Sequence, residues 1–165
     1  MTGIVVGIDG SPAADAALAF ALEEAKLRNL PLRIVCAWEI PAIEYAGAPF
    51  TVTPDLTTEA EHGAEIVLAE AVKRIGPHPG VHVETVSVHG HPPTILVEQA
   101  RDATLLVVGT RGRNTLASII LGSVSQAVAH HCPSPLTIVP GPHSTGPSTS
   151  GREEGVTEAQ PAVGV

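Results

Sequence analysis

The chain has few aromatic and few basic residues, and each scarcity disfavours a class of partner. Two Phe, one Trp and one Tyr are the aromatic residues among 165, which is too few for a surface that stacks nucleic-acid bases. Lys and Arg number 9 against 17 Asp and Glu, which gives a net charge of −8. A surface that binds phosphate backbones needs clustered cations, so no nucleic-acid partner is expected.

Cysteines and long apolar segments are scarce as well. The two cysteines, Cys36 and Cys132, lie within apolar segments and form no Cys-x-x-Cys pair, so we interpret both as small buried side chains. No apolar run approaches the roughly 20 residues that span a bilayer. The first residues lead directly into an apolar segment, without the basic region and apolar core of a signal peptide. These features predict a soluble, cytoplasmic protein with no membrane partner.

Residues 1–140 have the pattern of one α/β domain. Short apolar segments alternate with segments of helical period, which predicts right-handed β-α-β crossovers and a single open parallel sheet with helices on both faces. The expected strands are 3–8, 32–38, 81–89, 104–108 and 136–139. The expected helices are 12–29, 55–75, 92–100 and one that begins at Ser123. Residues 141–165 are rich in Gly, Pro, Ser and Thr without a hydrophobic period, so we expect a disordered tail there.

A glycine-rich motif joins the fourth expected strand to the last helix. It consists of Gly109-Thr110-Arg111-Gly112, nine further residues, and Gly122-Ser123. Glycine lets the backbone approach a ligand without a Cβ in the way, and a helix N-terminus offers N–H groups and a positive dipole end to phosphate. Ser123 followed by Gln126 fits a capping box, and we expect Gly122 to adopt a conformation that is costly for a β-branched residue. The motif predicts a site for a phosphorylated small molecule.

The motif resembles the nucleotide-binding signature of the universal stress protein family, in its ATP-binding branch. That signature is glycine, two residues, glycine, nine residues, glycine and then serine or threonine, and Gly109, Gly112, Gly122 and Ser123 match it. The resemblance covers residues 1–140. It implies a Rossmann-like, adenine nucleotide α-hydrolase-like fold with five strands in the order 3-2-1-4-5, and a homodimer that pairs through strand five. It also implies a regulatory stress-response module that binds ATP, with AMP or cyclic AMP as alternatives and Mg²⁺ left open.

In that strand order, the carboxyl ends of strands one and four flank the switch point of the sheet, where open α/β sheets bind ligands. Asp9 follows strand one and Gly109 ends strand four, so the two motifs are expected to meet. The resemblance implies that Asp9 contacts the ribose or its metal ion, and that the Ala37 backbone contacts adenine. Each residue also has a purely structural alternative: Asp9 as a turn residue that caps the next helix, Ala37 as core, and the glycines as turn residues.

The remaining candidates lie in and after the glycine motif. One of Arg111 and Arg113 is expected to pair with phosphate oxygens. The resemblance places Val124 and Ser125 near the β and γ phosphates, with Ser125 offering a hydroxyl. The full set of candidate binding residues is Gly7, Asp9, Ala37, Val108, Gly109, Arg111, Gly112, Arg113, Gly122, Ser123, Val124 and Ser125.

The sequence offers no catalytic residue. It contains no GxxxxGK[ST] phosphate loop, no G-x-S-x-G elbow and no HExxH, and no carboxylate lies in the glycine motif to orient an attacking water. The pairs His89-Gly90-His91 and His130-His131 lack further ligands at metal-binding spacing, so no metal site is expected. Binding without turnover is favoured over two alternatives: a slow ATPase or adenylyl-transferring enzyme, and an interaction protein with an empty site.

Overall fold

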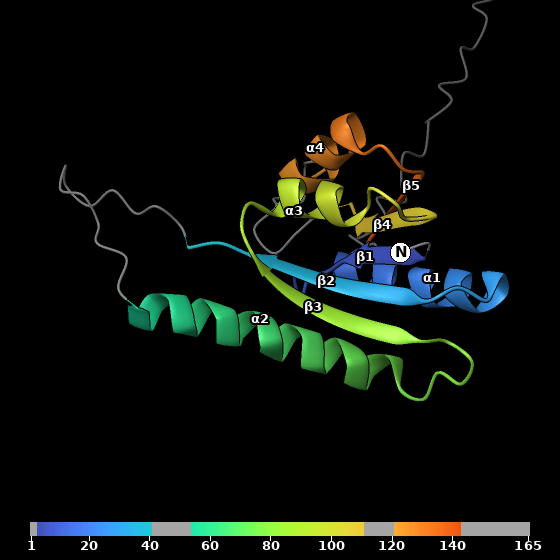
Figure 1. The fold of residues 1–165 in the computed structure, drawn as a ribbon, viewed down its shortest axis with the longest axis horizontal. Helices are drawn as coiled ribbons and strands as arrows, with labels where there is room; N and C mark the ends of the chain where they lie inside the picture. The colour runs from blue at the N-terminus through green and yellow to red at the C-terminus, as the bar shows by residue number, and fades with distance from the viewer. Residues whose placement is uncertain (1–2, 41–53, 111–120, 143–165) are drawn as a thin grey trace, which may run out of the picture.

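The computed structural model describes residues 3–40, 54–110 and 121–142, in which strands and helices alternate (Figure 1). The described elements are β1 (Ile4–Gly7), α1 (Pro12–Arg28), β2 (Leu32–Trp38), α2 (Pro54–Ile75), β3 (Val83–His89), α3 (Pro92–Gln99), β4 (Leu105–Gly109), α4 (Ser123–His131) and β5 (Leu136–Val139). Their order agrees with the order expected from the sequence. Of the expected tail, residues 141–165, the positions from 143 onward lie outside the described residues. None of the described helices is both long enough and apolar enough to cross a membrane.

All five described strands run parallel in one sheet, in the order β3-β2-β1-β4-β5. β1 lies in the middle, where Val6 pairs with Ile34 of β2 on one side and with Val107 of β4 on the other. The predicted fold class and strand order are therefore confirmed. Between β3 and β4 the chain crosses to the other side of β1, so the switch point of the sheet lies between β1 and β4.

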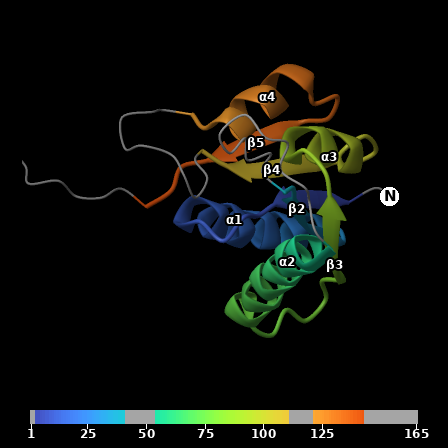
Figure 2. The ribbon, with the colours of Figure 1, turned by 90° about the vertical axis from the view of Figure 1, so that its left-hand side faces the viewer.

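Two helices cover each face of the sheet: α1 and α2 lie on one side, and α3 and α4 lie on the other (Figures 1 and 2). Successive residues of a strand point to opposite faces. In β1, Ile4 and Val6 pack with α1 and α2, whereas Val5 packs with α3 and α4. Because both faces are covered, β1 and β4 consist mainly of buried apolar residues without polar alternation.

The ends of α1 follow from local sequence signals. Ser11 is the N-cap, and its Oγ accepts a hydrogen bond from the Ala14 N–H at 3.2 Å. Pro12 takes the first helical position, where a missing N–H costs nothing. Asn29 ends the helix in the left-handed region, with a φ of 52°, and its N–H donates to the Lys26 carbonyl at 3.2 Å. Both ends were expected from the sequence.

Other boundaries differ from the expected ones by one or two residues. β3 begins at Val83 rather than at residue 81, because the Val81 N–H donates to the His78 carbonyl in a turn, at 3.2 Å. β4 extends to Gly109. The expectation for the cysteines holds for Cys36, which is buried, whereas Cys132 is partly exposed, and neither of the two forms a disulfide.

Candidate functional site

The carboxyl ends of β1, β2 and β4 lie side by side at one edge of the sheet. Val6 pairs with Val107, and this register, continued along the two parallel strands, brings Asp9 to the level of Thr110. Ala37 lies near the end of β2, on the other side of β1. The turn after β1 and the first residues of the glycine motif, Gly109 and Thr110, therefore meet at the switch point, where the sequence predicted a site.

Asp9 has a structural role in the turn between β1 and α1. Its Oδ1 accepts a hydrogen bond from the Ser11 N–H at 3.0 Å. Gly10, between them, has a φ of +78°, which disfavours residues that carry a Cβ. The turn is thus stabilised by the Asp9 carboxylate, as in the structural alternative considered for this residue. Contact of Asp9 with a ligand stays a prediction.

Gly7 and Gly109 both lie where a neighbouring helix packs closely. A Cβ on Gly7 would lie 2.8 Å from either terminal methyl carbon of Leu96 in α3. A Cβ on Gly109 would lie 2.7 Å from the carbonyl carbon of Ala13 in α1. The first contact is with a side chain, whereas the second is with backbone that cannot turn away. These two glycines let α3 and α1 approach the ends of β1 and β4.

The start of α4 differs from the expected capping box. Gly122, not Ser123, is the N-cap, and its carbonyl accepts the first helical hydrogen bond from the Gln126 N–H at 3.0 Å. No side chain makes a cap hydrogen bond here. Gly122 has a φ of −76° and a ψ of 166°, which is ordinary extended backbone that any residue adopts. The expected costly conformation of Gly122 is therefore wrong, and so is the expected capping box, because the helix begins one residue earlier than the box requires.

The side chains of the next residues in α4 point into the protein. Val124 packs against the core beneath α3 and α4. Ser125 is buried, with 2% of its surface exposed. Its Oγ donates toward two backbone carbonyls, that of Gly122 at 3.0 Å and that of Thr110 at 3.1 Å. The hydroxyl that the resemblance assigned to the outer phosphates is thus directed at the protein backbone.

Three candidates, Arg111, Gly112 and Arg113, lie outside the described residues, and their expected contacts with phosphate stay predictions. Val108 is a buried residue of β4 that packs on the side of α3 and α4. Among the residues that the structure describes, no group of three or more His, Cys, Asp and Glu side chains is placed to hold a metal ion.

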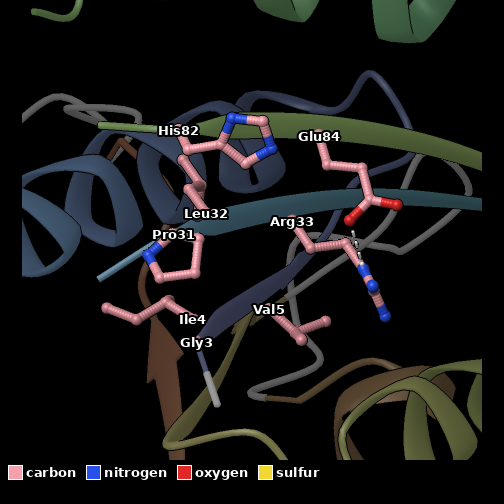
Figure 3. A pocket seen from close by; sticks show the side chains of 8 residues that line it. All are labelled: Gly3, Ile4, Val5, Pro31, Leu32, Arg33, His82 and Glu84. Atoms are coloured by element: carbon pink, nitrogen blue, oxygen red, sulfur yellow. Dashed lines mark hydrogen bonds and ion pairs between the residues drawn. The ribbon is translucent and has the colours of Figure 1, made fainter. Parts of the chain in front are cut away.

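A shallow pocket lies at the opposite edge of the sheet, at the amino ends of β1, β2 and β3 (Figure 3). Its volume is about 10 Å³, which is the space of a single water molecule. Arg33 and Glu84 face each other across β2 and β3 in an ion pair at 3.0 Å (Figure 3), and Arg33 also donates to the Gln99 side chain at 3.2 Å. This pocket is too small for a nucleotide, and its charged side chains Arg33 and Glu84 already pair with each other.

Sequence reasoning missed two features of the carboxyl edge. Thr110, an unassigned position of the glycine motif, joins three segments through its N–H, carbonyl and hydroxyl groups. Trp38, next to Ala37, donates from Nε1 to the Ser87 hydroxyl at 3.0 Å, and its ring centroid lies 4.7 Å from that of His89. The only sequence signal for either was its place beside a candidate residue.

The family profile and the curated relatives that match this chain belong to the same family. A sequence profile of the Universal stress protein family matches residues 1–140. Universal stress proteins Rv2005c and Rv2623 of Mycobacterium tuberculosis are 36% and 35% identical to the chain over 137 residues. Each alignment covers 82% of this chain and 44% of the relative. The chain thus spans less than half the length of these curated relatives.

Solved structures share the fold. A universal stress protein in complex with cAMP is 30% identical with a TM-score of 0.62, and the match covers 84% of this chain and 96% of that chain. Universal stress protein UspA from Lactobacillus plantarum is 23% identical with a TM-score of 0.64, covering 84% of this chain and 97% of that chain. The likeness therefore covers most of this chain and nearly all of each solved one.

Proposed function

Because the chain belongs to the universal stress protein family, we propose that it binds an adenine nucleotide at the carboxyl ends of β1 and β4. The observation that carries the proposal is the placement of the α4 N-terminus beside the end of β4, where the Gly122 N–H donates to the Thr110 carbonyl at 2.7 Å. This contact brings the first turn of α4 to the switch point of the sheet. The related protein in complex with cAMP supports an adenine nucleotide as the class of ligand.

The first turn of α4 receives the phosphates. A helix leaves the N–H groups of its first residues without intrahelical partners, and in α4 these residues begin with Ser123 and Val124. Such N–H groups, together with the helix dipole, favour negative charge. The Ser123 side chain is exposed and makes no cap hydrogen bond, which supports a role for its hydroxyl as a donor to a phosphate oxygen. Arg111 or Arg113 supplies the positive charge.

The nucleoside lies between β1 and β2. Asp9 accepts from the ribose hydroxyls while its Oδ1 holds the turn through the Ser11 N–H. The adenine edge meets the backbone of Ala37. We assign ATP as the ligand because the glycine motif matches that of the ATP-binding branch, and AMP and cyclic AMP are the alternatives. Since the sequence offers no group to activate water, the bound nucleotide acts as a regulatory signal in a stress response.

Two observations support a homodimer that forms through β5. β5 is the outermost described strand on its side of the sheet, and all of its residues are partly exposed. The carbonyls of Pro135 and Val139 accept from the N–H groups of Leu106 in β4 and of Thr110 just after it, at 2.9 Å each. By strand alternation, Leu136 and Ile138 therefore direct their N–H and C=O groups to the open side. An open apolar edge favours pairing with another strand, and a second copy of the chain provides an identical one.

Thermal unfolding with a panel of nucleotides tests the proposed ligand class. A ligand that binds only the folded state stabilises it by about 2.7 kcal/mol at 100 times its Kd. We expect ATP, AMP or cyclic AMP at millimolar concentration to raise the Tm, and GTP, which presents different base-edge groups to the β2 backbone, to leave it unchanged. An identical Tm with every nucleotide would overturn the proposal.

A further inference from the structure

Thr110 joins the end of β4 to both β5 and α4. Its N–H donates to the Val139 carbonyl at 2.9 Å, and its Oγ1 accepts from the Gly141 N–H at 3.4 Å. Its carbonyl accepts from the Gly122 N–H at 2.7 Å and from the Ser125 hydroxyl at 3.1 Å. The residues that enter and leave segment 111–121 are thus tied together by contacts that do not involve that segment.

The Ser125 hydroxyl is not needed to satisfy either of the carbonyls that it reaches. The Thr110 carbonyl already accepts from the Gly122 N–H, and the Gly122 carbonyl already accepts from the Gln126 N–H. A serine hydroxyl has a single proton to donate, and in Ser125 that proton is directed between two carbonyls, at 3.0 and 3.1 Å. A phosphate oxygen is an acceptor, so in this arrangement Ser125 has no proton to offer it.

We propose that Ser125 is a positioning residue, which holds the N-terminus of α4 against the end of β4 before the ligand arrives. The proposal rests on the proposed function, since the N–H groups so placed are those that receive phosphate. Fixing the donors in advance removes an ordering cost from binding. This role differs from the direct contact with the outer phosphates that the resemblance implied for Ser125.

The two roles predict that the loss of nucleotide affinity in Ser125→Ala depends differently on the number of phosphates in the nucleotide. If Ser125 contacts the outer phosphates directly, Ser125→Ala lowers the affinity for ATP and leaves the affinity for AMP unchanged. A positioning role means that Ser125→Ala weakens AMP, ADP and ATP alike, by about three- to tenfold, because the whole helix start is less well placed. The alanine variant is expected to fold, since both carbonyls keep a backbone donor and alanine favours helix.

Ser134→Ala is the matched control. The Ser134 hydroxyl also donates to a backbone carbonyl, that of Ala100, at the far end of α3. Its loss removes the same kind of hydrogen bond away from the site, so the affinities for all three nucleotides are expected to stay at the wild-type value.

The test combines amide hydrogen exchange of the ligand-free protein with calorimetric titration by AMP, ADP and ATP. We expect Ser125→Ala to accelerate exchange of the Gly122 amide by about tenfold and to weaken the three nucleotides equally, while Ser134→Ala changes neither. Unchanged Gly122 exchange, a loss confined to ATP, or faster exchange with unchanged affinities would each overturn the positioning role. If the wild-type protein binds none of the three nucleotides, the proposed function fails, and the positioning role fails with it even where Gly122 exchange accelerates.

Discussion

Gly109 and Ala13 are in such close contact that a Cβ on Gly109 would lie 2.7 Å from the carbonyl carbon of Ala13. The contact joins the end of β4 to the first turn of α1, on the side of the sheet that α1 covers. Gly141 approaches the same alanine, where an added Cβ would lie 3.1 Å from the Ala13 Cβ. The first glycine of the motif is therefore a packing requirement, whatever it also does for a ligand.

Gly109→Ala is expected to destabilise the protein. The new methyl group meets backbone atoms, which cannot rotate away, and overpacking of this kind costs about 1–3 kcal/mol. Gly63→Ala in α2 is the control, since a Cβ there meets nothing within 4 Å and alanine in a helix interior is more stable than glycine by about 0.5–1 kcal/mol. Urea unfolding measures both, and equal stability of the two variants would show that the contact with Ala13 is not rigid.

Ser11 and Ser123 both stand at the start of a helix, yet only Ser11 makes a cap hydrogen bond. We expect Ser11→Ala to lower the free energy of unfolding by about 1 kcal/mol. Ser123→Ala should change it by less than about 0.5 kcal/mol, as for an exposed substitution, while weakening ATP. A loss of unfolding free energy of the same size in both variants would show that Ser123 caps α4 after all, as the sequence predicted.

Two substitutions at Asp9 separate its turn role from its ligand role. Asp9→Asn keeps an oxygen that accepts from the Ser11 N–H, so its stability is expected to match the wild type. Asp9→Ala loses that hydrogen bond, so its free energy of unfolding is expected to fall by about 0.5–1.5 kcal/mol. Both lose the charge, so any dependence of ATP affinity on Mg²⁺ that Asp9 provides should disappear from both, as measured by titration with and without a chelator. Retention of that dependence in Asp9→Asn would place the metal ion elsewhere.

Ile138→Pro tests the proposed pairing of β5. Proline removes an N–H that points to the open side of the sheet and leaves the hydrogen bonds to β4 in place. Ile138→Ala removes the same packing against the core but keeps the N–H. We expect sedimentation to give monomers for the proline variant and dimers for the alanine variant. If both variants form dimers, the dimer interface does not involve β5.

Much of the fold is predictable because its signals are local. The strands 32–38 and 136–139 have the same bounds in the sequence analysis and in the structure, since each is a short, mainly apolar run that directly follows a proline. Ser11 and Pro12 start α1 and Asn29 ends it, and each signal acts within one helical turn. The strand order followed from the family resemblance, and the meeting of the Asp9 turn with the glycine motif followed from that order.

The details of the site were less predictable because they depend on contacts between distant segments. The start of α4 is set by the hydrogen bond from Gly122 to Thr110, which the spacing of Ser123 and Gln126 does not reveal. The Ser125 hydroxyl likewise reaches the carbonyl of Thr110, 15 residues away in the sequence. Likewise, the sequence alone does not show which helix lies against Gly109.

The central claim is that an adenine nucleotide lies at the carboxyl ends of β1 and β4 with its phosphates on the first turn of α4. The most direct measurement is a two-dimensional amide NMR titration of the protein with ATP. We predict that the largest chemical-shift changes occur at the Ser123, Val124 and Gly10 amides. The amide resonances of Leu32 and His82, at the opposite edge of the sheet, should stay unchanged. Shifts concentrated at Leu32 and His82, or an unchanged spectrum at millimolar ATP, would contradict the account.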